Sequence, residues 1–359
     1  MLATLIAFAV TTPPRDSIDL RFAFFGCNRI EKADWEATKA QNPSSANIPQ
    51  LVQNFRDIQS MEPIPLLTFV GGDLVLGYAD DDGSTFKLQM NGWRDLVHAQ
   101  PLDKLSNIIP FPGNHEMNKK IGDQRLSNPP TTALWNDWMR NSGFKQLAKN
   151  GPVPQGANPD NLANDQSILN YSFTRNGVHF VILNTDTATN LADEKDKSLT
   201  RIAWIPVDWA RKDIAKADAD PQVHATFVMG HRNLVAPQSS KGDAPIDAEA
   251  GARLLAIIRS SKKTRAYVCA HVHAWDVVNM GGSSKAWQVV AGNGGSKLEK
   301  DWSPAGGTFF GFAAFDVMRS GRVILHSYRR PTPAGKYDDA EPAPPAAKSV
   351  DTVLYDPVK

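Results

Sequence analysis

Cysteine is scarce in this chain, since Cys27 and Cys269 are the only two among its 359 residues. A small disulfide-stapled scaffold is excluded, because such scaffolds need several cysteine pairs. The sequence leaves open whether these two pair with each other or are buried free thiols. An excess of one charge is also lacking. Lys plus Arg number 39 and Asp plus Glu number 38, so no broad basic field indicates an obligate nucleic-acid partner.

Long apolar runs are lacking as well. The longest candidate, residues 2–10, is too short to cross a bilayer, which takes about 20 apolar residues, so no membrane span is expected. The run has the length of a signal-peptide apolar region, and Ala7-Phe8-Ala9 resembles a cleavage site, but no Lys or Arg precedes it. Residues 1–19 are therefore interpreted as a signal peptide or an N-terminal extension. Export to the periplasm or outside, and a cytoplasmic location, both stay open.

What the sequence has is the composition of a globular protein, with 42% apolar and 21% charged residues. Helical and strand patterns alternate at first, and strands dominate later. This order predicts an α/β domain over residues 20–330, with two packed sheets and helices outside them. Residues 116–169 have a weak pattern that indicates a long insertion over one face, with a helical patch over 134–144. Residues 331–359 are expected to form a Pro/Ala-rich extended tail.

The expected elements follow from apolar spacing and from Gly and Pro positions. A hairpin is expected over 171–186, turning at Asn176-Gly177. Helices are expected over 48–61, 93–105, 204–217 and 248–260. Further strands are expected over 20–25, 65–70, 108–111, 224–229, 266–270, 287–291, 308–317 and 322–328.

Polar side chains follow several of these strands, mostly in turns that contain glycine. In open α/β sheets, ligands bind at the carboxyl ends of the strands. A carboxylate, an amide oxygen and several imidazoles suit a hard or borderline divalent or trivalent metal. The sequence therefore predicts a metal site built from Asp73, Asn114, His115, His231, His271 and His273.

The motifs that carry these residues resemble, in the same order, those of the calcineurin-like metallophosphoesterases. They are Gly72-Asp73, Gly113-Asn114-His115-Glu116, Gly230-His231 and Ala270-His271-Val272-His273. The resemblance covers roughly residues 20–330 and extends to the purple acid phosphatase branch. It implies a four-layer α/β/β/α sandwich with two central sheets.

The resemblance also implies roles for these residues. Asp73 would bridge two metal ions, and His273 would bind the second of them. His115 would act as a general acid or donate to the phosphoryl oxygens. A metal-bound hydroxide would attack phosphorus in line. The remaining ligands of the first metal would be Asn114, His231 and His271.

The first motif departs from the family. The usual Asp-x-His is replaced by Cys27-Asn28-Arg29, and a permanently charged Arg29 cannot be a ligand. Cys27 can be one as a thiolate, and related secreted bacterial alkaline phosphatases are similar in using a Cys here to bind iron. In one interpretation Cys27 helps hold a second metal and Arg29 clamps the phosphate. In the other that metal is lost. The acid-phosphatase branch has a Tyr three residues after the bridging Asp, where this chain has Leu76; Tyr78 is displaced and receives no ligand role.

The resulting prediction is a metal-dependent phosphoesterase that hydrolyses a phosphomonoester or a phosphodiester, with a small phosphorylated substrate. Fe, Zn and Mn all tolerate the ligand set, and two ions are expected. The alternative is a catalytically weak phosphate- or nucleotide-binding protein with one metal. A purely structural fold would leave the Asp, Asn and His cluster without a role.

Overall fold

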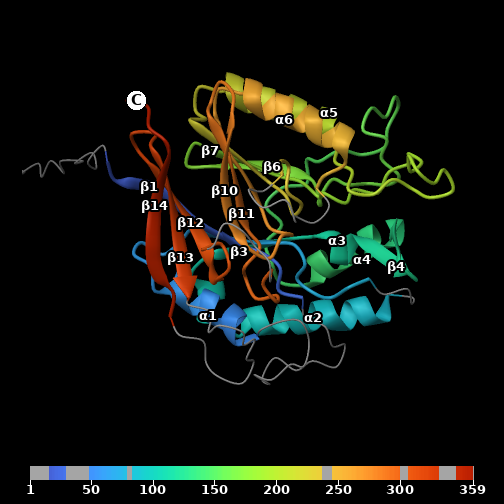
Figure 1. Ribbon diagram of the computed structural model, residues 1–359, viewed down its shortest axis with the longest axis horizontal. Coiled ribbons are helices and arrows are strands. Elements are labelled where there is room, and N and C mark those ends of the chain that lie inside the picture. The colour runs from blue at the N-terminus through green and yellow to red at the C-terminus, as the bar shows by residue number, and fades with distance from the viewer. Residues whose placement is uncertain are drawn as a thin grey trace, which may run out of the picture.

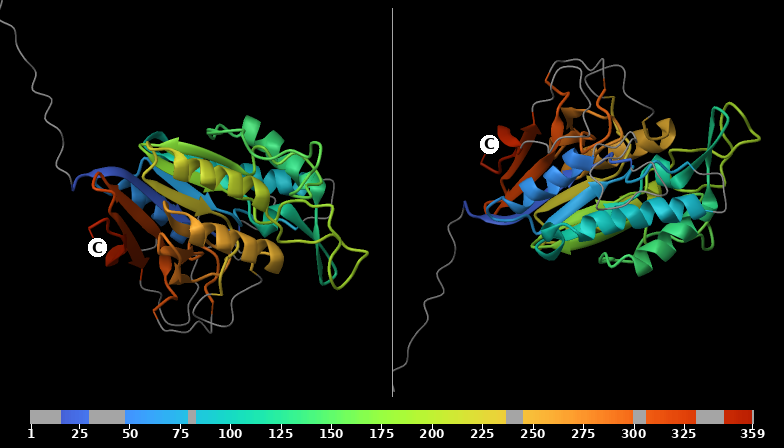
Figure 2. Two further views of the ribbon diagram at one scale, coloured as in Figure 1. Left: turned by 90° about the horizontal axis from the view of Figure 1, so that it is seen from above. Right: turned by 90° about the horizontal axis from the view of Figure 1, so that it is seen from below.

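A computed structural model of the chain describes residues 16–29, 48–78, 83–236, 245–299, 306–330 and 345–358. Within these ranges two six-stranded sheets pack against each other, and helices cover the outer face of each (Figures 1 and 2). This is the four-layer α/β/β/α sandwich that the motifs imply. Residues 1–15, most of the segment 1–19 that was interpreted as a signal peptide or an N-terminal extension, lie outside the described residues, and the first strand begins within that segment at Ile18. No helix in the described ranges is long and apolar enough to cross a membrane.

The first sheet has the strand order β14-β13-β12-β1-β2-β3. β1 pairs in parallel with β2, and β2 in parallel with β3, whereas β12, β13 and β14 add on in antiparallel fashion. The bounds are β1 (Ile18–Phe25), β2 (Leu67–Gly71), β3 (Asn107–Phe111), β12 (Phe310–Met318), β13 (Val323–Arg330) and β14 (Ala347–Tyr355).

The second sheet has the order β10-β11-β9-β8-β7-β6, with β7, β8, β9 and β11 parallel. The β6–β7 hairpin turns at Asn176 and Gly177, both with positive φ, which is the backbone that a two-residue hairpin loop favours. The hairpin prediction is thus confirmed. The bounds are β6 (Tyr171–Arg175), β7 (Val178–Ile182), β8 (Ala225–Met229), β9 (Thr264–Cys269), β10 (Trp275–Gly281) and β11 (Ala286–Ala291).

Aromatic side chains fill the space between the sheets. The ring of Phe22 on β1 lies 4.8 Å from that of Phe227 on β8 and 4.6 Å from that of Phe315 on β12, measured between centroids. Ala23 and Phe25, whose side chains are on the other face of β1, pack against the helical layer instead. Because both faces of the second half of β1 are covered, residues 22–25 form a continuous apolar run instead of an alternating one.

The helices cover the sheets in two groups, seen below and above the sheets in Figure 1. One group packs its apolar residues on the first sheet, and the other packs on the second. The first group is α1 (Ile48–Gln59), α2 (Ser84–His98) and α4 (Pro129–Asn141). The second is α5 (Val207–Ala219) and α6 (Ala248–Ser260).

Five elements differ from the expectation. The helix expected over 93–105 is α2, which ends at His98; a 3₁₀ turn (Pro101–Lys104) follows, because proline cannot continue the helical hydrogen bonds. β10 and β14 are edge strands with one exposed side, so neither shows an apolar run. β14 lies inside the expected tail and extends the first sheet. The insertion holds a short hairpin, β4 (Asn118–Ile121) and β5 (Gln124–Ser127).

Candidate metal centre

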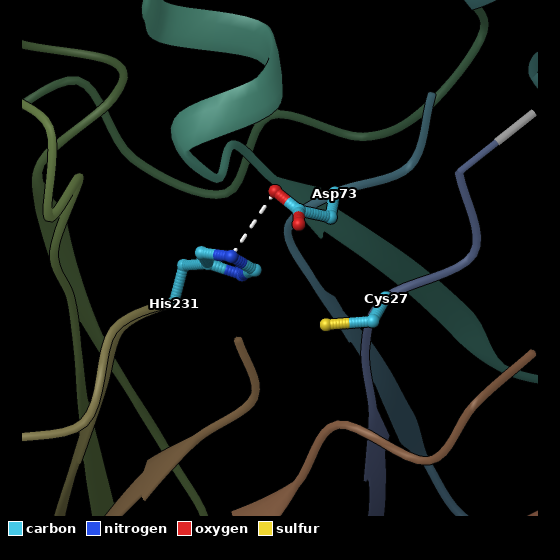
Figure 3. A group of neighbouring side chains, drawn as sticks. All are labelled: Cys27, Asp73 and His231. Carbon is cyan, nitrogen blue, oxygen red and sulfur yellow. Dashed lines mark ion pairs between the residues drawn. The ribbon is translucent and has the colours of Figure 1, made fainter. Parts of the chain in front are cut away.

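Strand ends from both sheets meet at one place. Cys27 follows β1, Asp73 follows β2 and His231 follows β8, and one ligand atom of each lies within 4.8 Å of the other two. Figure 3 shows the three side chains directed toward one another from different strand ends. All three are buried, and both cysteines of the chain are free thiols. Three of the predicted site residues therefore lie together although they are far apart in sequence.

The backbone turns sharply at these strand ends. Cys27, Asp73 and His271 have φ values of 62°, 52° and 61°, in the left-handed region that residues other than glycine seldom adopt. Such conformations persist where surrounding contacts fix them, and they concentrate at functional sites. Here the Asp73 carbonyl accepts from the backbone N–H of Asn28 at 2.7 Å and of Arg29 at 2.8 Å. These bonds tie the end of β1 to the end of β2.

Two glycines make room for the site. A Cβ on Gly72 would lie 2.5 Å from His231 Nδ1, and one on Gly113 would lie 2.5 Å from Asp73 Oδ1. Both distances are far below van der Waals contact. The glycines of the Gly-Asp and Gly-Asn-His motifs thus allow the side chains from three strand ends to approach one another.

The imidazole of His231 stands at the centre of the donor atoms. Its Nδ1 lies 2.8 Å from the carbonyl oxygen of Gly71, and a carbonyl only accepts, so Nδ1 carries the proton. Nε2 faces inward. The atoms 3.1 Å from Nε2 are Asp73 Oδ1, Asn114 Oδ1 and His271 Nδ1. Burial would lower the pKa of His231, but the Asp73 carboxylate outweighs it and raises that pKa. A carboxylate oxygen, an amide oxygen and two imidazole nitrogens are all metal-ligating atoms, so a cation could take the place of the protons that link them.

His273 is held in the same way. Its Nδ1 lies 2.8 Å from the carbonyl oxygen of Lys297, which fixes the tautomer with Nε2 unprotonated. Nε2 is buried and has no hydrogen-bond partner in the described part of the chain. Burial, reinforced by the cationic Arg29, lowers the pKa of His273 to about 3. A carbonyl that orients a histidine so that its free nitrogen is available is typical of metal-ligating histidines.

Charge around Asp73 is unusually dense. Burial alone would raise the pKa of Asp73, but His115, His231 and Arg29 outweigh it and hold that pKa well below its usual range. The Arg29 guanidinium lies 3.1 and 3.2 Å from Asp73 Oδ2. Arg29 thus neutralises the carboxylate oxygen on which a second metal would depend. His115 Nε2 lies 3.7 Å from the same oxygen, and its Nδ1 donates to the Leu76 carbonyl.

Without a bound metal ion, the Cys27 side chain is a protonated thiol. Burial, with the nearby Asp73 carboxylate, raises the pKa of Cys27 well above its usual value, and Arg29 only partly opposes this. A bound metal would reverse that balance, because coordination deprotonates a thiol. Both interpretations of Cys27 therefore remain compatible with its position.

Glu116 has a structural role that the motif alone does not reveal. Its buried carboxylate accepts from the backbone N–H of Asp73 at 3.0 Å, Val75 at 3.0 Å and Gly113 at 2.7 Å. It thereby joins the loop after β2 to the loop after β3. Burial and the neighbouring Asp73 raise the pKa of Glu116 to about 7.

Arg232 and Asp186 form a buried pair behind His271. Arg232 Nε and Nη2 each lie 2.8 Å from an oxygen of Asp186, and Nη1 lies 3.5 Å from His271 Nε2. The sequence leaves open whether Arg232 faces the substrate or the surface; its 1% exposed fraction excludes the surface. The sequence places Asp186 at the end of a hairpin but gives no indication that it pairs with Arg232, which is 46 positions away.

Tyr78 also belongs to the site. Its hydroxyl accepts from the side-chain amide of Asn114, and its ring centroid lies 4.1 Å from that of His115. Burial raises the pKa of Tyr78 to about 12, so the phenol stays protonated at neutral pH. Gly77 and Tyr78 both have positive φ, and this turn brings the displaced tyrosine back to the cluster. In the sequence, the glycine directly before Tyr78 is the feature that could have indicated this turn.

A pocket of about 560 Å³ opens beside these residues. Among the described residues that line it, three are permanently or normally cationic and none is acidic. An anion is therefore the ligand that this pocket favours. The lining residues are Arg29, Leu76, Gly77, Tyr78, His115, Lys120, Gly122 and Arg125.

No protein-family model and no curated protein matches the sequence. Solved structures are similar to it. A dimetal phosphatase from Danio rerio is 13% identical, with a TM-score of 0.52 over 87% of this chain and 96% of that one. PhoD is 10% identical, with a TM-score of 0.49 over 94% and 69%. A 5'-nucleotidase precursor from Thermus thermophilus is 15% identical, with a TM-score of 0.45 over 85% and 52%.

The chain has the fold of the calcineurin-like metallophosphoesterases, as its motifs predict. The dimetal phosphatase has a TM-score above 0.5, and the match covers nearly the full length of both chains. At 13% identity this likeness concerns the fold, and the activity has to be argued from the site.

Proposed function

We propose that this chain is a metal-dependent phosphoesterase that hydrolyses a phosphomonoester or a phosphodiester. The observation that carries the proposal is the convergence of Asp73, Asn114 and His271 on the buried Nε2 of His231, each at 3.1 Å. Oxygen and nitrogen donors in this combination suit Fe, Zn or Mn. The anion-favouring pocket beside them supports a phosphorylated substrate.

One metal ion would be held by the side chains of Asp73, Asn114, His231 and His271. Such an ion, when bound, activates water as a nucleophile and neutralises charge on a phosphoryl group. The chain's part is to keep the donors in position. The Gly71 carbonyl orients His231, and Glu116 fixes the backbone of Asp73.

A second metal ion would use Cys27, His273 and the other oxygen of Asp73. The partnerless Nε2 of His273 supports this ion, since a buried nitrogen without a partner costs free energy. The Arg29–Asp73 ion pair favours the alternative, a weakly catalytic phosphate- or nucleotide-binding protein with one metal, because the guanidinium occupies that oxygen. We favour the binuclear hydrolase, in which the substrate's phosphate draws Arg29 toward itself.

Arg29 and His115 would handle the phosphate. Both line the pocket, and both reach the same oxygen of Asp73. A guanidinium forms paired, charge-assisted hydrogen bonds with phosphate oxygens and keeps its charge at every relevant pH. His115 also lines the pocket, and with Nδ1 held by the Leu76 carbonyl it would give a proton to the leaving oxygen in its protonated form.

The test uses the full chain loaded in turn with Fe, Zn and Mn. Metal content per chain is measured together with hydrolysis of p-nitrophenyl phosphate and bis-p-nitrophenyl phosphate. We expect bound metal and hydrolysis of at least one ester; His231→Ala should lower the metal content per chain and abolish the hydrolysis. The matched control is His179→Ala, since His179 is a buried histidine that pairs with Asp213, away from the cluster. A chain that binds metal but hydrolyses neither ester would favour the binding-protein alternative.

A further inference from the structure

The β4–β5 hairpin is attached directly to the candidate site. It begins at Asn118, immediately after the short helix α3 (Asn114–Met117), and Figure 1 shows β4 next to α3 and α4. The Asn118 side-chain amide donates to Asp186 Oδ1 at 2.7 Å. Lys119 forms a β-bridge with Tyr78. The base of the hairpin is therefore held on both sides by residues around the metal cluster.

Two cations face each other across this hairpin. Lys120 on β4 is the register partner of Arg125 on β5, so both side chains are on the same face of the hairpin. Partners of this kind have Cβ atoms about 5 Å apart, and like charges in that position destabilise the pair. Both residues line the pocket, with Arg29 and His115. An anion bound between Lys120 and Arg125 would remove the repulsion.

The polar side chains of the pocket fall into two groups. Arg29 and His115 lie against Asp73, at the metal cluster. Arg125 is instead placed against Tyr78, with its guanidinium carbon 5.6 Å from the centroid of that ring, and it has Lys120 as its cross-strand neighbour. The pocket volume of about 560 Å³ is in the range of pockets that hold whole organic ligands, roughly 300–1,000 Å³, and exceeds what a single phosphate needs.

From these observations we infer that Lys120 and Arg125 form a second phosphate subsite, and that the preferred substrate carries two phosphate groups. One phosphate lies at Arg29 and His115 and is cleaved; the other lies between Lys120 and Arg125 and belongs to the leaving group. The cleavage rests on the proposed function. In it, the oxygen of water bonds to the first phosphorus, the bond from that phosphorus to the ester or bridging oxygen breaks, and this oxygen leaves with the electron pair and takes up a proton.

The kinetic test compares kcat/KM for matched substrates with one and two phosphates. ADP against AMP examines an anhydride, and fructose 1,6-bisphosphate against fructose 6-phosphate examines two separate esters. In at least one pair we expect a preference on the order of 10- to 100-fold for the second phosphate, from its charge-assisted hydrogen bonds. The double variant Lys120→Ser, Arg125→Ser is expected to abolish this preference, with kcat/KM for the two-phosphate member of each pair falling to that of its one-phosphate partner.

The matched control is Lys119→Ser, since Lys119 is on the same strand and directed to the opposite face. It is expected to keep the preference. Lack of preference in the wild type, or an equal loss for both members of each pair in the double variant, would overturn the subsite.

A binding measurement separates this inference from the proposed function. Calorimetric titration of the metal-loaded chain with inorganic diphosphate and with inorganic phosphate needs no turnover. Diphosphate is expected to bind at least about 10-fold more tightly than phosphate to the wild type and to Lys119→Ser, and no more tightly than phosphate to the double variant. If no phosphoester is hydrolysed, the proposed function fails, and this titration alone decides the subsite: equal affinities for both anions would reject it.

Discussion

Replacing Glu116 by Gln should lower the free energy of unfolding and weaken metal binding, because Glu116 holds the loops that carry metal ligands and is not a ligand itself. The carboxylate accepts three backbone N–H bonds, at 2.7, 3.0 and 3.0 Å, from the loops after β2 and β3. A glutamine has one acceptor oxygen, so its NH₂ group would face the Val75 N–H and leave that donor unpaired. One lost charge-assisted bond and two weakened ones amount to about 3–5 kcal/mol. This is a large part of the roughly 5–15 kcal/mol that stabilises a typical domain.

The measurement is urea unfolding of the metal-free variant, followed by tryptophan fluorescence, together with metal affinity by titration. Because Glu116 positions Asp73 through its backbone, affinity is expected to fall about 10- to 100-fold. The control is Glu249→Gln, an exposed carboxylate paired with Arg201, for which the change should stay below about 1 kcal/mol. A loss below about 1 kcal/mol for Glu116→Gln, with metal affinity unchanged, would refute the argument that this carboxylate holds the two loops.

Three further predictions concern other residues. Cys27→Ala should lower metal content from two ions per chain to one by elemental analysis; one ion in both proteins would contradict a thiolate ligand. Arg29→Met should weaken inhibition by inorganic phosphate about 10- to 100-fold with metal content unchanged, whereas a loss of metal would assign Arg29 to holding the ligand carboxylate. Burial alone would raise the pKa of Asp316, but its bonds to Arg21 and His326 outweigh this and hold it below its usual value. Such a carboxylate stabilises the fold above its unfolded pKa of about 4, and the effect is lost as pH falls through the lower folded pKa. Thermal unfolding midpoints of wild type and Asp316→Asn should therefore differ most near neutral pH and converge in acid; a constant difference would contradict this.

The sequence predicted the parts of the site that depend on local pattern. An apolar strand followed by a glycine turn is a local signal, and it located Asp73, His231 and His271 at strand ends that the structure brings together. The sandwich followed from the same runs and from the order of the motifs. The contact between Cys27 and Asp73 required the resemblance as well, since spacing alone does not place β1 beside β2.

What the sequence missed depends on distant partners. Asp186 becomes informative only once Arg232 lies against it, and Tyr78 only once the Gly77 turn returns it to Asn114. β14 resembles a polar tail because one side of an edge strand faces solvent. The β4–β5 hairpin is too short for alternation to be visible, so the cross-strand pairing of Lys120 with Arg125 had no sequence signal.

The clustered side chains of Cys27, Asp73 and His231 follow strands of both sheets. Tight metal binding therefore requires both sheets to be folded and packed together, because a partly folded intermediate with only one sheet in place has no complete ligand set. Loops this long close late, because contacts of high sequence separation cost the most chain entropy. A metal ion should accordingly bind after the sheets dock and slow unfolding without speeding folding, so that in cells the metal supply would set how long the finished protein lasts.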